Sequence, residues 1–212
     1  MPDTSTLMIF VTASMLLLIT PGPAVLYIIT RSIDQGRMAG IVSALGIGTG
    51  TMFHVAGAAL GLSAILVSSA LAYSVVKYLG AAYLIYLGIR TFRARSALEQ
   101  PTLNGQKSLS RIFQQGVVVN VLNPKVALFF FAFLPQFVDP NGGTVALQVL
   151  FLGVLFVVLG IFSDSIYALL AGTAGQWLKS SAAFLRGQRY FAGTIYVALG
   201  LATALSGSHN KS

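Results

Sequence analysis

Apolar segments about as long as a membrane is thick fill most of this chain. A helix rises 1.5 Å per residue, so about 20 apolar residues cross the hydrocarbon core of a bilayer. Hydrophobic residues make up 56% of the 212 residues and charged residues only 8%, whereas soluble domains carry about 25% charged residues. A soluble fold could not cover its surface with so few charges. The sequence therefore predicts an integral membrane protein.

The apolar segments predict an all-α fold with six membrane-spanning helices. We expect the spans at residues 7–30, 39–66, 71–90, 112–136, 145–171 and 189–205. Polar turns are expected at 31–37 and 137–143, and a loop at 172–188. The first run lacks a basic region before it and a clear cleavage site, so we expect it to be retained as a span rather than removed as a signal peptide. The polar segment 93–111 is expected to link two three-helix units, 1–92 and 112–212, within one transmembrane domain.

Two short polar stretches interrupt the first and fourth spans, Thr20-Pro21-Gly22-Pro23 and Asn123-Pro124-Lys125. Proline removes a backbone donor and clashes with the preceding turn, so each stretch should break its helix. In hydrocarbon, the freed backbone groups are tolerated only where they line a polar cavity or find partners inside the protein. Two matched breaks therefore predict a binding site near the midplane of the membrane. The alternative is that each proline only kinks its helix.

Similar pieces of sequence recur in the same order in the two halves. The matched pieces are Ile19-Thr20-Pro21 with Leu122-Asn123-Pro124, Gly50–His54 with Gly160–Asp164, and Lys77-Tyr78 with Arg189-Tyr190. A Leu-Gly pair follows Tyr78 and Tyr190 at the same spacing. A unit of three spans is odd, so the second copy must enter the membrane from the opposite side. The pattern predicts an inverted repeat, an architecture that many secondary transporters use.

The basic residues predict the orientation in the membrane. Ten lie in one set of expected loops, namely Arg31, Arg37, Arg90, Arg93, Arg95, Lys107, Arg111, Lys179, Arg186 and Arg189. The opposite side holds only Lys77 and Lys211. Because positive charge is enriched in cytoplasmic loops, the ten-residue side, with the 93–111 linker, is expected in the cytoplasm and both termini outside.

Few ionisable residues lie inside the expected spans. Asp164 is the only acid deep in a span, and a charge there is costly enough that it usually has a function. It could couple transport to protons, or simply form an ion pair with Lys125. His54, its counterpart in the repeat, is a second coupling candidate, although histidines in helices often only hydrogen-bond a neighbour. Asp34 lies where the first span ends, as a gate candidate or as part of a local ion-pair cluster.

Three motifs together resemble the LysE/RhtB superfamily of amino-acid exporters. They are Leu-Ile-Thr-Pro-Gly-Pro at 18–23, Gly36-Arg37-x-x-Gly40 with Gly46 after it, and Asn120-x-x-Asn123-Pro124-Lys125. The resemblance covers nearly the whole chain and agrees with its length and span count. It implies a bacterial inner-membrane efflux carrier for amino acids, driven by the proton gradient, and it allows a homodimer. It does not specify the substrate.

The resemblance and the breaks together select candidate site residues. We expect the substrate to contact Thr20, Pro21, Gly22, Pro23, Asn120, Asn123, Pro124 and Lys125. Half-helices starting after each break would present free amides to the substrate carboxylate, and unwound carbonyls would accept from its ammonium group. With one acid and one lysine in the interior, a neutral amino acid is favoured over a dicationic one.

Other functions are less consistent with the sequence. The net charge of +8 could suggest nucleic acid, but the basic residues lie between apolar runs rather than on one face. Export of a metal cation or another small solute stays an alternative, although a tight cation site usually needs more hard oxygen ligands than Asp164 and His54 offer. A membrane-embedded enzyme is a remote alternative, since the chain has no HExxH motif, no cysteine and no pair of intramembrane aspartates. No cofactor or bound metal is expected.

Overall fold

The computed structural model describes residues 2–68, 70–93, 107–139, 143–180 and 182–205, and every regular element in these ranges is helical. In chain order the elements are α1 (Thr4–Ile19), α2 (Pro23–Gln35), α3 (Arg37–Ser68), α4 (Ala70–Arg93), α5 (Leu109–Val121), α6 (Pro124–Leu128), the π-helical turn η1 (Phe129–Phe133), the 3₁₀ turn η2 (Leu134–Phe137), α7 (Val145–Ser180) and α8 (Ala182–Leu205). The predicted all-α class is confirmed.

Both predicted helix breaks are present. The helix axis bends by 53° between α1 and α2 and by 48° between α5 and the segment Pro124–Phe137. Pro23 and Pro124 each occupy the first turn of the helix that follows the break. Proline suits that position because its missing N–H would have no partner there.

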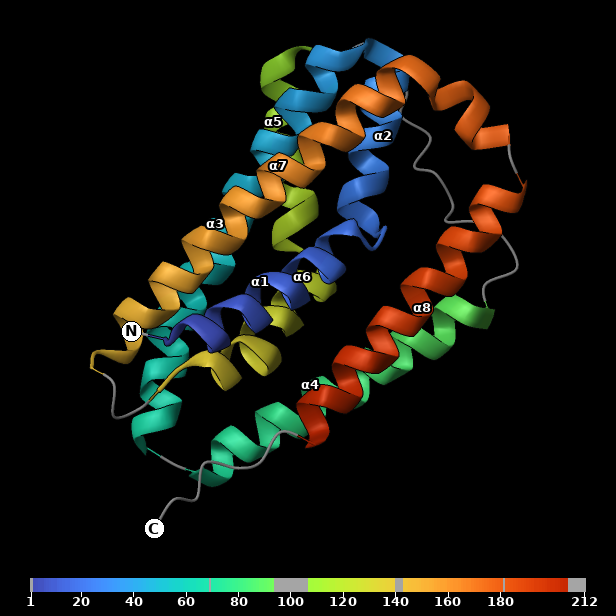
Figure 1. The fold of residues 1–212 in the computed structure, drawn as a ribbon. Helices are drawn as coiled ribbons and strands as arrows, with labels where there is room; N and C mark the ends of the chain where they lie inside the picture. The colour runs from blue at the N-terminus through green and yellow to red at the C-terminus, as the bar shows by residue number, and fades with distance from the viewer. Residues whose placement is uncertain (1, 69, 94–106, 140–142, 181, 206–212) are drawn as a thin grey trace.

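Two pairs of helices form the body of the molecule (Figure 1). The long helices α3 and α7 pack side by side, α2 packs on both of them, and α5 packs on α3 and α2. Helices α4 and α8 form the second pair, and α1 packs mainly on α7. The two breaks are therefore enclosed by helices from both halves of the chain.

Close contact between α3 and α5 depends on small residues. A Cβ added to Gly46 would clash with the carbonyl oxygen of Phe113, and one added to Gly50 would lie 2.8 Å from that of Val117. Since side chains never approach backbone so closely, only glycine lets these helices pack at this distance. The same seam carries the polar contacts of the candidate site.

A cluster of aromatic rings fills the core beside the second break. Phe129 stacks on Phe156 of α7 at a centroid distance of 4.5 Å, and Phe10 of α1 meets Phe137 edge-on at 5.3 Å. Phe133 lies between, 5.3 Å from Phe129 and 5.1 Å from Phe137. These contacts connect α1, η1, η2 and α7 on one side of the breaks.

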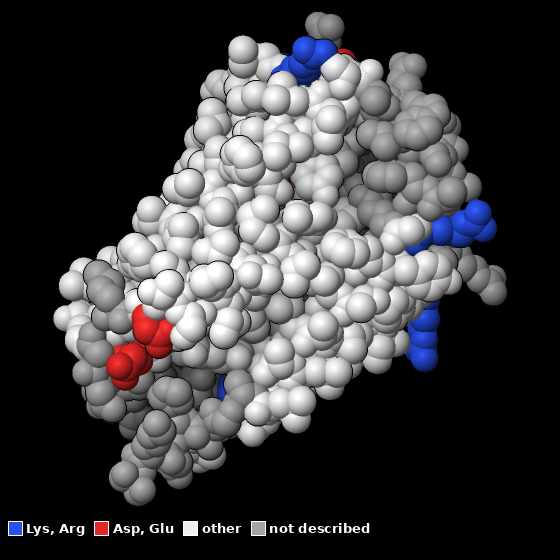
Figure 2. Space-filling view, in the orientation of Figure 1, with Lys and Arg blue, Asp and Glu red and all other residues white. Residues whose placement is uncertain are grey.

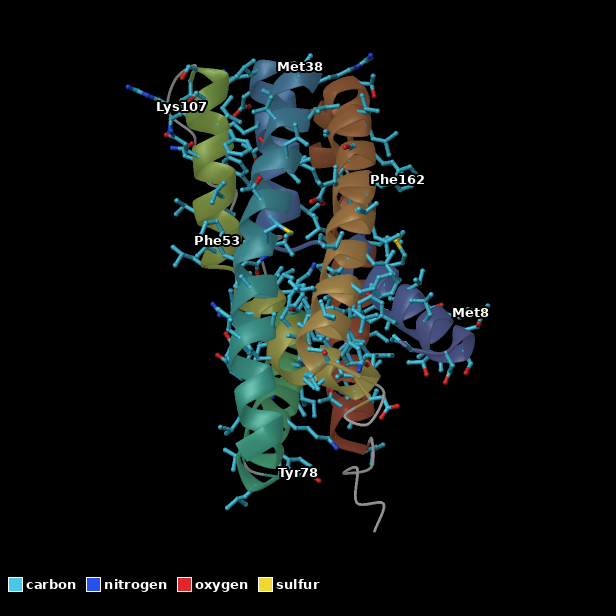
Figure 3. All side chains as sticks on the ribbon, turned by 90° about the vertical axis from the view of Figure 1, so that its left-hand side faces the viewer. Met8, Met38, Phe53, Tyr78, Lys107 and Phe162 are labelled. Carbon is cyan, nitrogen blue, oxygen red and sulfur yellow. The ribbon has the colours of Figure 1, made fainter. Side chains whose placement is uncertain are left out.

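The surface between the ends of the molecule is largely uncharged. Figure 2 shows charged residues mainly at the ends of the viewed face, with a broad uncharged band between them. In Figure 3 the exposed side chains of Met8, Phe53 and Phe162 project outward from α1, α3 and α7.

At the N-terminus, Asp3 caps α1 by accepting from the Thr6 amide at 2.8 Å and the Ser5 hydroxyl at 2.6 Å. The Ser5 hydroxyl and then the Thr6 amide lower the pKa of this carboxyl.

The helices support a multi-pass membrane protein. Arg37–Gly61 in α3 and Val145–Thr173 in α7 are long and apolar enough to cross a bilayer, and each bent pair passes the same test as one span. The described residues thus contain two to four candidate spans. Membrane crossing by α4 and α8, which the six-span arrangement requires, stays a prediction.

Three expected boundaries were wrong. α2 continues through the expected turn to Gln35, and Gly36, with φ +84°, alone separates it from α3. The segment 172–188 is helical up to Ser180 and again from Ala182, so the expected loop is absent from the described part of it. Gly172, Gly175 and Gly187 lie within these helices, since one glycine inside a helix costs only about 0.5–1 kcal/mol. The expected linker ends early because α5 begins at Leu109, and residues 94–106 and 140–142 lie outside the described residues.

Candidate functional site

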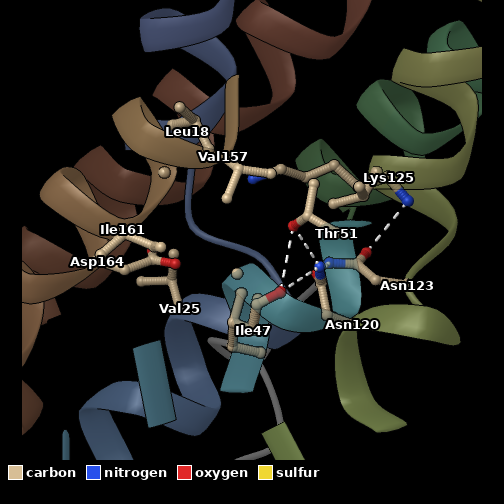
Figure 4. Close-up of a pocket in the computed structure, with 14 residues that line it drawn as sticks. Leu18, Val25, Ile47, Thr51, Asn120, Asn123, Lys125, Val157, Ile161 and Asp164 are labelled. Atoms are coloured by element: carbon tan, nitrogen blue, oxygen red, sulfur yellow. Dashed lines mark hydrogen bonds between the residues drawn. The ribbon is translucent and has the colours of Figure 1, made fainter. Parts of the chain in front are cut away.

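A small cavity lies between the two helix breaks (Figure 4). Its volume is about 30 Å³, room for one or two water molecules. The lining comes from α1, α2, α3, α5, α6 and α7 and comprises Leu18, Ala24, Val25, Ile47, Gly48, Thr51, Asn120, Asn123, Lys125, Val126, Val157, Gly160, Ile161 and Asp164. Four of the predicted site residues, Asn120, Asn123, Lys125 and Asp164, therefore meet in one cavity.

Asn120 joins the end of α5 to α3. Its side-chain amide donates to the Ile47 carbonyl at 2.9 Å and to the Thr51 hydroxyl at 2.7 Å. The backbone carbonyl of Asn120 is 2.9 Å from Nε2 of His54, whose ring stacks on Phe130. All donors of the Asn120 side chain thus have partners on one helix, so this side chain has a fixed orientation.

Asn123 caps the half-helix α6. Its Oδ1 accepts from the Lys125 amide at 3.1 Å, and its Nδ2 donates to Asn120 Oδ1 at 3.3 Å. A side-chain oxygen at the N-cap satisfies one of the free amides of the first turn. The second break is thereby held in a single polar network with α5 and α3.

Lys125 connects the second break to the first. Its side chain is buried, and Nζ donates to the backbone carbonyl of Thr20 at 2.6 Å. The hydrogen-bond partner of Lys125 inside the protein is thus a carbonyl freed by the break between α1 and α2. Asp164 approaches the cavity from the other side (Figure 4), and the two residues form no ion pair in this structure.

Asp164 is 5% exposed and faces the cavity. No described residue hydrogen-bonds to its carboxyl group. Among the described residues, Lys125 is the charged group that interacts electrostatically with it. Buried charged groups are normally paired, because desolvation is costly. An unpartnered carboxyl beside a cavity can hold a cationic group or a proton there.

The first break has no side-chain cap. Gly22 is the N-cap of α2, and Thr20 Oγ1 is directed back to the carbonyl of Leu16 at 2.7 Å. The Ile19 carbonyl accepts from the Tyr167 hydroxyl of α7 at 2.7 Å. A Cβ on Gly22 would lie 3.5 Å from both Lys125 Cδ and the buried Tyr196 hydroxyl of α8. Pro21 is buried at this break, whereas Pro23 is exposed.

The first turns of α2 and α6 both border the cavity. Ala24 and Val25 of α2 and Val126 of α6 contribute to its lining. The first amides of a helix have no partner within the helix and carry a partial positive charge. Pro124, which starts α6, is itself exposed. The cavity therefore combines two helix N-termini and an ammonium group with one carboxyl group.

His54 and Asp34 lie outside the cavity lining. His54 contacts Asn120 and Phe130, as described above. Asp34 is exposed near the end of α2, and Arg31 bonds to Gln35 and Gln115 rather than to it. Arg31 therefore does not take part in the local ion-pair cluster that was one alternative for Asp34, and the role of Asp34 as a gate stays a prediction.

Sequence reasoning missed two residues that hold the site together. Thr51 accepts from Asn120, and Tyr167 donates to the first break. Thr51 lies in the repeated segment Gly50–His54, and Tyr167 follows Asp164 by one helical turn, so both were marked by their neighbours. The described residues contain no group of three or more His, Cys, Asp or Glu side chains that could hold a metal ion.

The sequence is similar to known transport proteins. The family model of the LysE type translocator matches residues 15–207. The homoserine/homoserine lactone efflux protein of Salmonella typhimurium is 36% identical over 170 residues, covering 80% of this chain and 82% of the relative. The uncharacterized membrane protein YrhP of Bacillus subtilis is 30% identical over 209 residues, covering 94% of this chain and 99% of that protein.

An uncharacterized membrane protein of Vibrio cholerae is 29% identical over 186 residues, covering 88% of this chain and 90% of the relative. No solved structure matches the chain significantly. Translocators and efflux proteins are transporters rather than enzymes. With a family model spanning nearly all of its length, this chain belongs to the LysE type translocator family.

Proposed function

We propose that this protein is a secondary carrier that exports a small neutral amino acid across the bacterial inner membrane. The observation that carries the proposal is the cavity between the breaks. A zwitterion has one carboxylate and one ammonium group, and the cavity has complementary groups for both. The N-termini of α2 and α6 with Lys125 suit the carboxylate, and Asp164 suits the ammonium group.

The charge of the cavity favours a neutral amino acid. Asp164 is the one acid among its described lining residues, so a dicationic substrate would place a second positive charge beside Lys125. The Salmonella relative is named for homoserine and its lactone, and homoserine is a neutral amino acid with a short side chain. We therefore take homoserine as the first substrate to test.

The cavity must open for transport. About 30 Å³ is too small for an amino acid, so the cavity has to widen before it can hold one. We infer that the two halves are inverted repeats, because each half has a broken helix, a long helix and a second long helix in the same order. Alternating access would then move one repeat against the other around the breaks.

Asp164 is the proposed site of proton coupling. Burial disfavours a charged carboxylate, whereas the ammonium group of Lys125 or of the substrate favours it. Asp164 would take up a proton from the outside as substrate leaves and release it to the cytoplasm when the next substrate binds. The outer location of both termini follows from the basic loop residues, and a homodimer stays a prediction.

The proposal is tested by transport in reconstituted vesicles. Wild-type protein should exchange labelled homoserine without a gradient and concentrate it when a pH gradient is imposed. Asp164→Asn should lose gradient-driven accumulation but keep exchange at a weaker affinity, because the asparagine oxygen can still accept from the ammonium group. Asp139→Asn, which changes an acid outside the cavity, should keep both. Failure of the wild type to move any neutral amino acid would refute the proposed function.

The same assay separates coupling from structural pairing. If Asp164 only balanced Lys125, its asparagine variant would lose both activities, and Lys125→Met in addition would restore them. An Asp164→Asn protein that still concentrates substrate would show that another residue couples transport to protons. Transport of a metal cation instead of amino acids would support the alternative substrate class.

A further inference from the structure

A second buried charge lies away from the cavity, on α2. Arg31 is 0% exposed, and its guanidinium group faces α5. Nη1 donates to Gln35 Oε1 and Nη2 donates to Gln115 Oε1, both at 2.9 Å. The buried Nε has no hydrogen-bond partner.

Arg31 has no negative partner among the described residues. Its two acceptors are neutral amides, and the nearest acid in sequence, Asp34, is exposed and not bonded to it. The ring of Tyr27 lies 5.6 Å from the guanidinium carbon, and the Tyr27 hydroxyl donates to the Ile112 carbonyl of α5 at 2.8 Å. Buried charges are normally paired with an opposite charge, and neutral amides compensate only in part.

The position of Arg31 relates it to the cavity. It follows Ala24, a cavity-lining residue, by seven residues on α2. Seven residues are about two helical turns, so the two positions share a face and lie about 10 Å apart. α5, which carries Gln115, ends at the cavity with Asn120. The seam between α2 and α5 thus leads from Arg31 to the cavity.

We propose that Arg31 is a second, transient binding site for the carboxylate of the substrate. The substrate would occupy this site as it passes between the cavity and the end of the molecule where α2 ends. This inference rests on the proposed function, which makes the substrate an amino acid. A carboxylate matches the guanidinium group in bidentate geometry, and such a charge-assisted pair is stronger than bonds to neutral amides. The side chains of Gln35 and Gln115 occupy the site until a carboxylate replaces them.

Replacement of the two glutamines would also open the seam. Gln115 is the link from Arg31 to α5, and Gln35 holds the chain just before α5 by two bonds. Its Nε2 donates to the Lys107 carbonyl at 2.9 Å, and its Oε1 accepts from the Lys107 amide at 3.1 Å. Release of Gln115 from Arg31 would leave the bond from the Tyr27 hydroxyl to the Ile112 carbonyl as the remaining link between α2 and α5 at this end, which weakens the contact. Substrate carboxylate would therefore act as the ligand that loosens the contact.

The test uses a single cysteine in this cysteine-free chain. Ile112 is fully buried in the seam beside Tyr27, so Ile112→Cys should react with a maleimide only when the seam opens. The protein is reconstituted in phosphatidylcholine vesicles and labelled with the maleimide in the presence of one of three additions. These are homoserine, an equimolar mixture of the neutral amino acids, and homoserine lactone. The lactone has the amino group but no carboxylate.

The expected result is faster labelling with homoserine or the amino-acid mixture and no acceleration with the lactone. Arg31→Gln should raise the half-maximal concentration about tenfold or more, the factor for losing a hydrogen bond to a charged group. The half-maximal concentration for Arg31→Lys should fall between those of the parent and Arg31→Gln. Arg111→Gln, which removes an exposed arginine from the same end of α5, should behave like the parent. Gln115→Glu places a permanent carboxylate on α5 beside Arg31, which strengthens the link between the helices, so it should label slowly and should not respond to amino acids.

Several outcomes would overturn the inference. Equal acceleration in the parent and Arg31→Gln, equal efficacy of the lactone, no acceleration by any amino acid, or a responsive Gln115→Glu protein would each do so. If vesicles with phosphatidylglycerol accelerate labelling without amino acid, the counter-ion is a lipid headgroup and the substrate assignment is wrong. Homoserine transport that survives Arg31→Gln unchanged would remove this site but leave the proposed carrier function intact.

Discussion

The two helix breaks are similar in sequence but differ in how their polar groups are satisfied. Both precede a half-helix with proline in its first turn. At the second break, Asn123 caps α6 and bonds to Asn120, which in turn bonds to α3. At the first break, Gly22 offers no cap, and the freed carbonyls of Ile19 and Thr20 accept from groups on other elements.

This difference assigns different tasks to the breaks. The second is a pre-formed anchor whose own side chains satisfy it and which extends Lys125 toward its counterpart. The first depends on Lys125 and Tyr167, so its carbonyls become available to a substrate as soon as those donors move. We infer that the first break changes more during transport than the second.

The largest expected effect concerns the side of the membrane on which each broken helix begins. If the halves are inverted, the residues before the two breaks lie on opposite sides of the membrane. A single cysteine at Ser5 should react with an impermeant maleimide in intact cells, and one at Asn104 only after the cells are permeabilised. Labelling of Asn104→Cys in intact cells would contradict the inverted arrangement.

Removal of the prolines tests whether the breaks serve transport or folding. Pro21→Ala and Pro124→Ala should reach the membrane in nearly normal amounts and lose most homoserine export, because each change removes a proline ring that constrains the backbone of its break beside the cavity. Pro140→Ala, between the expected spans, is the control. Normal export would show that the proline only kinks the helix, and loss of the protein itself would show a structural role.

The contact between the breaks is tested at Lys125. Lys125→Met keeps the length of the side chain but removes the donor to Thr20. Export should fall about tenfold or more, since a hydrogen bond to a charged group contributes about 1.5–3 kcal/mol and 1.4 kcal/mol is a factor of ten. Homoserine exchange and protein amount in the membrane are measured together. Export at the wild-type rate would mean that the breaks work independently.

The smallest effect compares the two caps directly. Asn123→Ala should lower the free energy of unfolding by about 0.5–2 kcal/mol through loss of the N-cap. Gly22→Ala should change it little, because φ is −147° there and the new Cβ would make ordinary contacts at 3.5 Å. Reversible denaturant unfolding in detergent measures both. Equal destabilisation would show that the first break is as tightly held as the second.

Local features of this site were predictable from sequence. Proline breaks a helix through its own ring and missing donor, so Pro21 and Pro124 located both breaks without knowledge of the fold. Asn before proline at the start of a helix is a common cap, and Asn123 is one here. The error at 172–188 arose because glycine and polar residues lower helix propensity only slightly and packing can override them.

The sequence by itself determined the membrane class, the all-α fold, the two breaks and the presence of Asp164 and Lys125 in the interior, because composition and backbone sterics act within a few residues. Only the tertiary structure decided which distant groups meet. Lys125 bonds to Thr20 rather than to Asp164, Asp164 faces the cavity without a partner, and Arg31 turns to Gln115 instead of Asp34. The physical reason is that a buried polar group takes the partner that helix packing brings within hydrogen-bond distance, and spacing along the chain does not specify that packing.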